Sequence, residues 1–431
     1  MKISKKIIAV LLSAFMMVIC MQPMGVSAKE DDNWVGAWST SPVEFNLKKI
    51  LNLSCIENEY GLHNLTFRTR LQPTIEGKKI RITLSNVYGT GDMVVDAVTV
   101  AKGSEKYGQT MSLKTKKTVT FDGSKKAVIP QGKTLTSDPI DLSVNALEYV
   151  TITTYMKNTD HLKTFGLIGG NTYIGSGNQT NLPTTVGVPM KLKGDFGEYS
   201  VIPLISQLEV YNPHSSATVL IGDSTLANDI PILLAKRLNE QGINNVGILQ
   251  QAIKGNRLLA DGAGALGMAY GEAMMKRFER DALNLSGVKN IIIKVGDNDI
   301  IHPNCKSMQG KALKVTTEEM IEGYKKLIDM AHQKGIKVYL MTRTAWKGYT
   351  RNILNTGDDI QWSEELDSMR KDINNWIKSS DNLADGYIDL DYLCKDEGFT
   401  ELKDELTTDG VHFTSAGQQA VVDGIPLNIF R

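Results

Sequence analysis

The chain of 431 residues has few cysteines and histidines, and it lacks several catalytic motifs. It holds four cysteines and six histidines. There is no Cys-x-x-Cys pair and no Cys/His spacing typical of a zinc site, so no structural or catalytic metal is expected. Neither His-Glu-x-x-His nor Gly-x-Ser-x-Gly occurs. These absences argue against a zinc metallohydrolase and against a serine hydrolase built around a Gly-x-Ser-x-Gly turn.

The chain also lacks an excess of charge of either sign. Its 48 basic residues equal its 48 acidic residues in number, and no basic stripe appears, so we expect no nucleic-acid partner. Beyond the N-terminus no run is long and apolar enough to cross a bilayer, so we expect no stable membrane anchor. No motif indicates a bound cofactor, and we expect none.

The N-terminus has the pattern of a secretory signal peptide, which we assign to residues 1–28. A segment with three lysines precedes an apolar run, Ile7–Cys20, and small residues at Val26–Ala28 provide a cleavage site. A membrane anchor is less favoured because the run is short. A lipoprotein signal at Cys20 is less favoured because Ile19 stands where a small residue is needed. We therefore expect a secreted, extracellular protein.

Cleavage after Ala28 would leave a chain of 403 residues with a net charge of about minus three, because the signal segment holds three lysines and no acidic residue. At this length two domains are expected. Three cysteines would remain, Cys55, Cys305 and Cys394. An odd number leaves at least one thiol free, and the sequence does not decide whether Cys305 and Cys394 form a disulfide.

Residues 29–213 have the pattern of an all-β domain, either a sandwich or a jelly roll. Short runs of alternating apolar and polar residues are separated by turn signals, and no helix of ordinary length is indicated. The stretch 169–188, rich in Gly, Asn and Thr, is expected to be a long loop, and 211–216 a linker. No catalytic cluster is evident. The strand candidates are Leu65–Leu71, Lys79–Leu84, Met93–Val100, Thr118–Phe121 and Tyr149–Tyr155.

Residues 217–431 alternate between strand and helix patterns, which implies a parallel sheet with helices on both faces. The continuous apolar run Lys289–Val295 is typical of a strand buried on both faces. Thr316 and Glu319 form a capping box that opens a helix. The other strand candidates are Val219–Ile221, Val246–Leu249, Ile336–Met341 and Tyr387–Leu390, and further helices are expected at Leu366–Ile377 and Thr414–Ile425.

The chain is organised around the stretch 217–228. An apolar run there ends at Gly222-Asp223-Ser224, and Asp229–Pro231 then opens a helical pattern. Ser224 is therefore expected between the end of a strand and the start of a helix. Because ligands bind at the carboxyl ends of the strands in an open α/β sheet, Ser224 is a candidate nucleophile.

Three further stretches lie at strand ends or before a helix, and with Ser224 they supply the parts of an acyl-transfer site. A serine nucleophile needs a base, and the base needs an orienting carboxylate; His412 and Asp409, three residues apart, can provide them. Oxyanion donors can come from the Gly255 N–H and the Asn298 side chain. Each residue also has a purely structural interpretation, as a turn glycine or a capping side chain. Together, in this order, the four stretches favour catalysis.

These residues also carry a family resemblance. Gly222-Asp223-Ser224, Gly255, Gly296-x-Asn298-Asp299 and Asp409-x-x-His412 resemble the four blocks of the SGNH/GDSL hydrolases, over roughly residues 217–431. The resemblance implies a flavodoxin-like α/β three-layer sandwich with a parallel sheet. It implies Ser224 as nucleophile, His412 as base and Asp409 as its orienting residue. It also implies an oxyanion hole formed by Ser224, Gly255 and Asn298.

Two residues near these blocks have a different expected role. Thr225 stands where the family has leucine, and we expect it to affect only the local turn. His302 is interpreted as structural or substrate-facing, not as the base. The N-terminal half is similar to the β-rich domain that precedes the hydrolase domain in some secreted bacterial members, on the segments Trp34–Pro42 and Arg81–Asn86.

The sequence therefore favours a secreted serine esterase that cleaves carboxylic esters through an acyl-enzyme. The expected substrate is an ester partner with an acetyl or short acyl group on a carbohydrate or small molecule. An acylated polysaccharide and a lipid both remain open. The alternatives are a lipase- or lysophospholipase-type esterase, acyl transfer to a sugar, and a carbohydrate-binding protein with an inactive hydrolase domain. The motifs do not reveal the acyl length.

Overall fold

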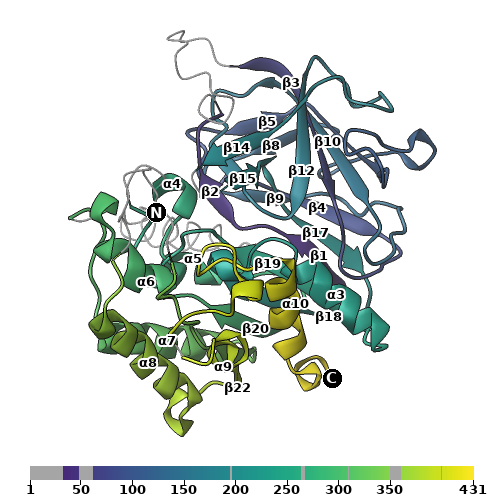
Figure 1. The fold of residues 1–431 in the computed structure, drawn as a ribbon. Coiled ribbons are helices and arrows are strands. Elements are labelled where there is room, and N and C mark those ends of the chain that lie inside the picture. Colours follow the sequence, from purple (N-terminus) through teal and green to yellow (C-terminus); the bar gives the residue numbers. More distant parts are fainter. Residues whose placement is uncertain are drawn as a thin grey trace, which may run out of the picture. The chain divides into compact units, whose positions relative to one another are not determined.

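The computed structural model describes residues 33–47, 62–194, 197–263, 267–308, 310–349, 361–398 and 400–431. Antiparallel strands build the first part of this chain, and a parallel sheet with helices builds the second part (Figure 1). The fold class expected from the sequence is confirmed for both parts. The expected signal peptide and Cys55 lie outside the described residues.

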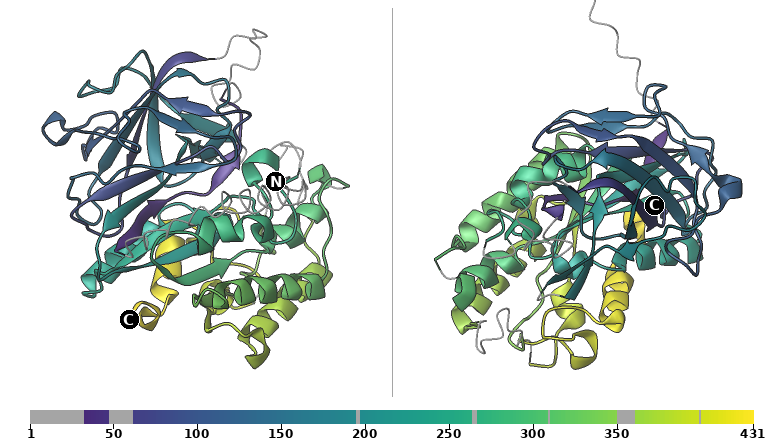
Figure 2. Two further views of the ribbon diagram at one scale, coloured as in Figure 1. Left: turned by 180° about the vertical axis from the view of Figure 1, so that it is seen from behind. Right: turned by 90° about the horizontal axis from the view of Figure 1, so that it is seen from above.

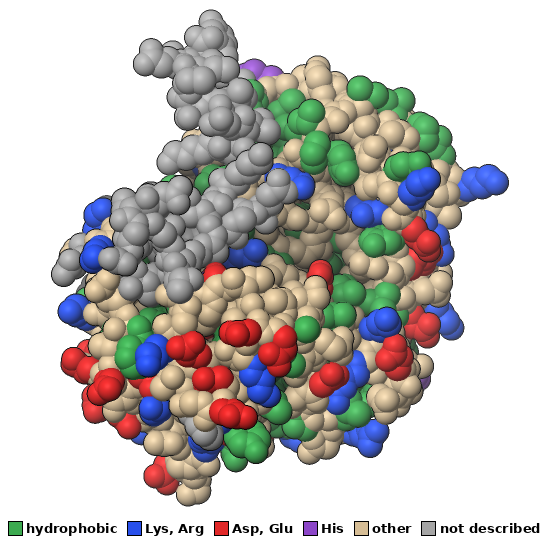
Figure 3. Space-filling model, viewed as in Figure 1, with side chains coloured by type: hydrophobic (Ala, Val, Ile, Leu, Met, Phe, Trp, Pro, Cys, Tyr) green, Lys and Arg blue, Asp and Glu red, His purple; other side chains and the backbone are tan. Residues whose placement is uncertain are grey.

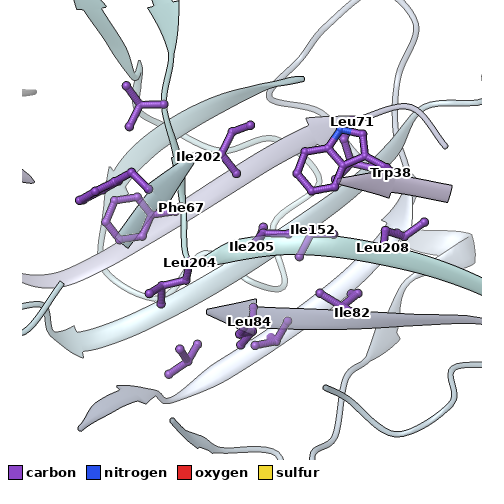
Figure 4. Close-up of a cluster of buried hydrophobic side chains, with 14 of the residues drawn as sticks. Trp38, Phe67, Leu71, Ile82, Leu84, Ile152, Ile202, Leu204, Ile205 and Leu208 are labelled. Carbon is purple, nitrogen blue, oxygen red and sulfur yellow. The ribbon is translucent and has the colours of Figure 1, made fainter. Parts of the chain in front are cut away.

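Two antiparallel sheets of the first part form a sandwich around a shared hydrophobic core. Figure 4 shows Ile82, Leu84 and Leu208 of one sheet in this core with Phe67 and Ile152 of the other. Burial of these apolar faces against each other is the main stabilising contribution to such a sandwich. One sheet has the order β1 (Trp34–Ser39), β17 (Ile205–Tyr211), β4 (Ile80–Ser85), β9 (Thr134–Thr136), and the other has the order β13 (Val188–Pro189), β12 (Gly170–Ser176), β3 (His63–Leu71), β10 (Val150–Asn158), β6 (Ala97–Lys102), β7 (Lys117–Thr118).

Smaller antiparallel groups complete the first part. They are β16 (Ile202–Pro203), β11 (Thr164–Gly166) and β2 (Pro42–Glu44), then β14 (Lys191–Gly194) with β15 (Gly197–Ser200), and β5 (Met93–Val95) with β8 (Ala127–Ile129). The run Met93–Val100 is therefore divided between two strands, β5 and β6, that belong to different sheets.

One segment of the sandwich differs from the sequence-based prediction of a long loop. A long loop is expected at 169–188, but the first part of this stretch, residues 170–176, forms strand β12, which pairs along its whole length with β3; residues 177–187 form no strand. Thr172 and Ile174 are buried, and Thr172 Oγ1 lies 2.9 Å from Thr69 Oγ1 of β3. Because two glycines and an asparagine, residue types that are depleted in strands, lie among its seven residues, its conformation depends on backbone pairing with a strand far away in the sequence.

The second part contains a five-stranded parallel sheet. Every neighbouring pair of strands is parallel. The chain order of the strands gives the spatial order 2-1-3-4-5, which is the flavodoxin-like arrangement. In this order the first strand is an inner strand, so its carboxyl end lies between those of its two neighbours. The strands run β19 (Val246–Ala252), β18 (Ser216–Gly222), β20 (Val288–Lys294), β21 (Lys337–Met341) and β22 (Gly386–Ile388).

Successive residues of the central strands enter two different cores. In β18, Val219 packs in the core that contains residues of α7 and α8, whereas Leu220 packs in the core that contains residues of α3 and α10; in β20, Ile293 and Ile292 divide in the same way. This double burial explains the continuous apolar runs of the sequence, and Figure 2 shows helices on both sides of the sheet. The helices are α3 (Ile230–Glu240), α4 (Gly267–Tyr270), α5 (Met274–Phe278), α6 (Asp297–Ile301), α7 (Thr317–His332), α8 (Glu364–Lys378), α9 (Leu390–Cys394) and α10 (Ser415–Gly424).

The sandwich covers the edge strand of the parallel sheet. Strand β19 is an edge strand of this sheet, and an edge presents backbone groups without a strand partner. Thr74 Oγ1 of the sandwich donates to Ile248 O at 3.1 Å and accepts from Ile248 N at 2.8 Å, and Ser41 Oγ donates to Gln251 O at 3.1 Å. Residues Trp34–Arg431 accordingly form one compact unit.

The charged side chains are mixed on the visible surface. On the face shown in Figure 3, Lys and Arg side chains alternate with Asp and Glu over the helical part of the molecule. This mixture is consistent with the equal numbers of basic and acidic residues in the sequence. Within the described ranges, no helix combines the length and the apolar composition needed to cross a membrane.

Candidate active site

Ser224 lies immediately beyond the carboxyl end of the inner strand β18. Strand β18 ends at Gly222, and Ser224–Leu226 then forms a single 3-10 turn. The Asp223 carboxylate caps this turn, since its Oδ1 accepts from Thr225 N at 3.0 Å and from Thr225 Oγ1 at 2.6 Å. Thr225 thus acts within the local turn, as expected, and the turn presents the Ser224 side chain at the sheet edge where ligands bind.

His412 and Asp409 complete a chain of hydrogen bonds with Ser224. His412 Nε2 lies 3.0 Å from Ser224 Oγ, and His412 Nδ1 lies 2.7 Å from Asp409 Oδ2. Both ring nitrogens are therefore engaged, one by the hydroxyl and one by the carboxylate. The structure brings together these three residues from loops 188 positions apart in the sequence, in the arrangement that a nucleophile, a base and an orienting carboxylate require.

The loop that carries Asp409 and His412 is fixed by backbone hydrogen bonds. Asp409 Oδ1 accepts from Val411 N at 3.1 Å and from His412 N at 2.8 Å. Gly410 has a φ of 90°, and a Cβ built there would lie 2.3 Å from the backbone of Gly348. Glycine at 410 is therefore required both by its backbone conformation and by the close approach of a second loop.

The charge state of Asp409 suits its position beside the imidazole. Burial by itself would raise the pKa of this carboxyl, but the hydrogen bond and charge of His412, with the N–H groups of His412 and Val411, outweigh burial and lower the pKa below its ordinary value. Asp409 is therefore a carboxylate near neutral pH and can accept a hydrogen bond from the Nδ1–H group of His412.

Gly255 and Asn298 line the same cavity as Ser224. Gly255 follows strand β19 with a φ of 78°, and a Cβ there would lie 2.2 Å from the ring of Tyr270. Asn298 lies in α6, just beyond β20, and its Nδ2 donates to Asn256 O at 3.0 Å. An amide nitrogen has two protons, so this bond fixes the side chain and leaves a second N–H.

The cavity at this edge of the sheet is small. Its volume is about 210 Å³, below the range of roughly 300–1,000 Å³ that is usual for pockets holding drug-sized ligands. All five residues expected from the sequence reach it. It is lined by Asp223, Ser224, Thr225, Asn228, Lys254, Gly255, Asp297, Asn298, Ile301, Tyr349, Thr408, Asp409, Val411, His412 and Phe413.

The second part of the chain matches a known family. Residues 216–420 fit the model of the GDSL-like lipase/acylhydrolase family. This segment is an SGNH/GDSL hydrolase domain. The match makes the protein a carboxylic ester hydrolase. No match was found among curated proteins.

Several solved structures are similar to the hydrolase domain at low identity. An acetyl xylan esterase has 20% identity, with 48% of this chain and 96% of that chain covered and a TM-score of 0.35. A GDSL-like lipase from Bacteroides thetaiotaomicron has 18% identity, with 50% and 87% covered and a TM-score of 0.33. An acetyl xylan esterase from Geobacillus stearothermophilus has 16% identity, with 50% and 95% covered and a TM-score of 0.38.

A buried network that the sequence did not reveal holds the Asn256 backbone. The guanidinium of Arg277 donates to Asn256 Oδ1 at 2.8 Å, to Gly222 O at 3.3 Å and to Ser41 Oγ at 3.0 Å. Asn256 in turn offers its backbone carbonyl to Asn298. One buried cation thus connects the ends of β18 and β19 in the hydrolase domain with the sandwich. No spacing rule identifies Arg277, because its partners are far apart in the sequence.

Asp299, next to Asn298, has a structural role in the hydrolase domain. It accepts from Leu258 N at 2.7 Å and from Leu259 N at 3.2 Å, and Arg257 Nε lies 3.8 Å away. Burial raises the pKa of this carboxyl, and the Arg257 charge and the two N–H groups oppose the rise. Asp299 therefore anchors the loop after β19, which carries Gly255.

A second buried acid lies directly under the nucleophile turn. Asp223 is fully buried, and burial raises the pKa of its carboxyl while the nearby Lys294 ammonium opposes this effect. Lys294 is itself paired with Asp297. These groups belong to the ends of β18 and β20, and the Lys294 ammonium carries the charge opposite to that of both carboxylates.

His302 is buried. Of the two roles that the sequence suggests, structural or substrate-facing, the structure favours the structural role. His302 packs against Tyr270 with ring centroids 5.2 Å apart. Burial, together with the Arg257 charge, lowers the pKa of His302 to about 3. The ring is therefore neutral near neutral pH, and the imidazole that contacts Ser224 is that of His412.

The two described cysteines do not form a disulfide. Cys305 and Cys394 are both buried and are not joined to each other. Burial raises the pKa of Cys394 to about 11, so this thiol is not a reactive thiolate at neutral pH. Among the residues that the structure describes, no group of three or more His, Cys, Asp or Glu side chains has a metal-binding arrangement.

Proposed function

We propose that this carboxylic ester hydrolase is a secreted serine esterase that removes acetyl or short acyl groups from a carbohydrate or small molecule. The observation that supports the mechanism is the chain of hydrogen bonds from Ser224 through His412 to Asp409. The signal-peptide pattern of residues 1–28 supports secretion.

In this mechanism Ser224 forms an acyl-enzyme. Ser224 Oγ attacks the ester carbonyl carbon, and its proton passes to His412 Nε2. The tetrahedral intermediate collapses, the bond to the alcohol oxygen breaks, and the alcohol leaves with the proton from His412. A water molecule then attacks the acyl carbon and gives its proton to His412. The bond between the acyl carbon and Ser224 Oγ then breaks, the proton passes from His412 Nε2 to Ser224 Oγ, and the acid is released.

Asp409 and the hydrogen-bond donors of the cavity stabilise the charges that develop on His412 and on the substrate oxygen. Asp409 holds His412 in the tautomer with a proton on Nδ1 and stabilises the imidazolium that forms. The N–H groups of Ser224 and Gly255 and the side chain of Asn298 are the proposed oxyanion hole. Their value lies in being fixed before the charge appears, and the hydrogen bond from Asn298 to Asn256 supports this fixation.

The size of the catalytic cavity favours a short acyl group. A volume of about 210 Å³ accommodates an acetyl or other small group more readily than a long acyl chain, which needs an extended apolar channel. A lipase-type esterase is therefore the second candidate. The carbohydrate-binding alternative, with an inactive hydrolase domain, gains no support from the geometry, because the hydroxyl, imidazole and carboxylate are within hydrogen-bond distance.

A chain-length series tests the proposed function. The protein is incubated with 4-nitrophenyl acetate, butyrate, octanoate and palmitate, and initial rates are measured. We expect kcat/KM to be highest for acetate or butyrate and to fall by about tenfold or more at octanoate, because each misplaced methylene costs a substantial part of the binding energy. A maximum at octanoate or palmitate would instead support the lipase-type candidate. The absence of hydrolysis of every ester would refute the proposal.

Replacement of Asn298 by alanine tests the oxyanion hole. We expect kcat to fall by about 10²–10³-fold, because one preorganised donor to the oxyanion is lost. Asn304→Ala is the matched control, since Asn304 is a half-buried asparagine at the end of the same segment. It should retain its rate. An Asn298→Ala variant with the wild-type kcat would remove Asn298 from the proposed oxyanion hole, and thermal melting would show that both variants are folded.

A further inference from the structure

A second cavity adjoins the catalytic cavity, between the hydrolase domain and the sandwich. Its volume is about 510 Å³. Asn228 and Lys254 line both cavities, so the two are contiguous. The walls come from both parts of the chain, and we call this cavity the sandwich groove. Its lining includes Arg70, Tyr149 and Asn171 from the sandwich, and Asn228, Asp229 and Lys254 from the hydrolase domain.

We propose that the sandwich groove binds the alcohol portion of the ester and that this portion is a carbohydrate chain. The inference rests on the proposed esterase function, in which the acyl group occupies the catalytic cavity beside Ser224. The alcohol oxygen then lies near His412, and the rest of the alcohol continues past Asn228 and Lys254 into the groove. Its volume is more than twice that of the catalytic cavity, which suits a chain of sugar units.

Polar side chains that are available for hydrogen bonds support a carbohydrate ligand. Asn171, Asn228 and Asp229 are exposed, and within the described part of the chain no hydrogen bond is recorded for their side chains. An amide both donates and accepts, and a carboxylate accepts. Sugar hydroxyls do both as well, so the three side chains match them. Asp229 precedes helix α3 without capping it through its side chain, which leaves its carboxylate available to a ligand.

An aromatic ring held in place by a cation supports the same ligand. The Arg70 guanidinium lies 4.1 Å from the centre of the Tyr149 ring. Arg70 Nη1 is itself fixed by the carbonyls of Ser104 at 2.8 Å and Glu105 at 3.1 Å. The Tyr149 ring is half-buried and has the Arg70 guanidinium over one of its faces. A rigid ring with a polar hydroxyl offers an apolar surface for the C–H groups of a sugar at little cost in conformational entropy.

The apolar residues of the sandwich groove argue against a long acyl chain as the ligand. Leu71, Leu167 and Ile168 belong to its lining, but they are buried, with exposures of 1%, 6% and 6%. They therefore offer little free apolar surface. A channel for an acyl chain would need such surface along its length, because its affinity comes from burial of methylene groups.

The test fills the groove from the sandwich side and compares substrates. The variant is Asn171→Trp, at an exposed position whose side chain has no hydrogen-bond partner among the residues that the structure describes. The matched control is Asn145→Trp, at an exposed asparagine of the sandwich that is not part of the groove lining. The substrates are 4-nitrophenyl acetate, 4-nitrophenyl octanoate and a partly acetylated xylotetraose. The kinetic parameters kcat and KM are measured for each combination.

We expect Asn171→Trp to lower kcat/KM for acetylated xylotetraose by about tenfold or more, mainly through KM, because loss of a well-fitted binding contact has an effect of this size. The rate with 4-nitrophenyl acetate should remain unchanged, as should all rates of Asn145→Trp. Unchanged kinetics of Asn171→Trp with the oligosaccharide would overturn the inference and leave the proposed function intact. A selective loss with octanoate would also overturn it, since the groove would then hold the acyl chain.

Direct binding of the oligosaccharide provides a second test that does not depend on hydrolysis. If Asn171→Trp loses activity with all three substrates, or if the wild type cleaves none, binding of acetylated xylotetraose is measured by calorimetry. The proteins compared are Ser224→Ala and the double variant Ser224→Ala/Asn171→Trp. Weaker binding by the double variant supports the groove, and equal binding or no binding by both overturns it. Hydrolysis by the wild type tests the proposed function separately.

Discussion

Replacement of Ser224 by alanine should lower kcat for 4-nitrophenyl acetate by about 10⁴–10⁶-fold, the range seen when a serine nucleophile is removed from such a site. The reason is that the covalent route disappears, while the oxyanion donors and the imidazole remain. In the proposed mechanism Ser224 Oγ is the nucleophile, whereas His412 acts as the base and Asp409 orients it, so neither neighbour takes over the role of the hydroxyl. KM should change little, because the cavity is otherwise intact.

The experiment compares Ser224→Ala with Ser380→Ala, which removes an exposed hydroxyl outside the catalytic cavity. The control should have the wild-type rate. A slowly hydrolysed ester should add the mass of one acyl group to the wild-type protein and none to Ser224→Ala. A Ser224→Ala variant that retains a tenth or more of the activity, or that still becomes acylated, would place the nucleophile elsewhere.

Replacement of Asp409 by asparagine should lower kcat by about 10⁴-fold with the loop geometry retained. The asparagine oxygen can still accept from the N–H groups of Val411 and His412. Its NH₂ group then faces His412 Nδ1. Because an amide NH₂ group donates hydrogen bonds and does not accept them, it favours the tautomer in which Nδ1 carries no proton. That tautomer places a proton on Nε2, and the imidazole can no longer act as a base toward Ser224.

Asp404→Asn is the control for this substitution, because it removes a carboxylate from an exposed position five residues earlier. Its kcat should be unchanged. Thermal melting should show Asp409→Asn folded, since the bonds that organise the loop are retained. A loss of less than tenfold in a folded Asp409→Asn protein would show that the carboxylate does not set the tautomer of His412.

The sequence alone predicted the fold class of both parts and the residues that meet at the cavity. This was possible because the relevant signals are local. A buried parallel strand is a continuous apolar run, as in Lys289–Val295. The short interval between Asp409 and His412 lets one loop place the carboxylate on the imidazole. The expected helix after Asp229 and the capping box at Thr316 likewise depend on residues within one turn.

Only the tertiary structure decided features that depend on distant partners. Strand β12 forms because β3 pairs with it, although its composition indicates a loop. Arg277 joins Ser41, Gly222 and Asn256, which the sequence separates widely. The sandwich groove likewise needs two parts of the chain to pack side by side. Local propensity determines which elements form, but contacts between elements depend on burial and hydrogen bonding across the packed surfaces, which no single stretch of sequence encodes.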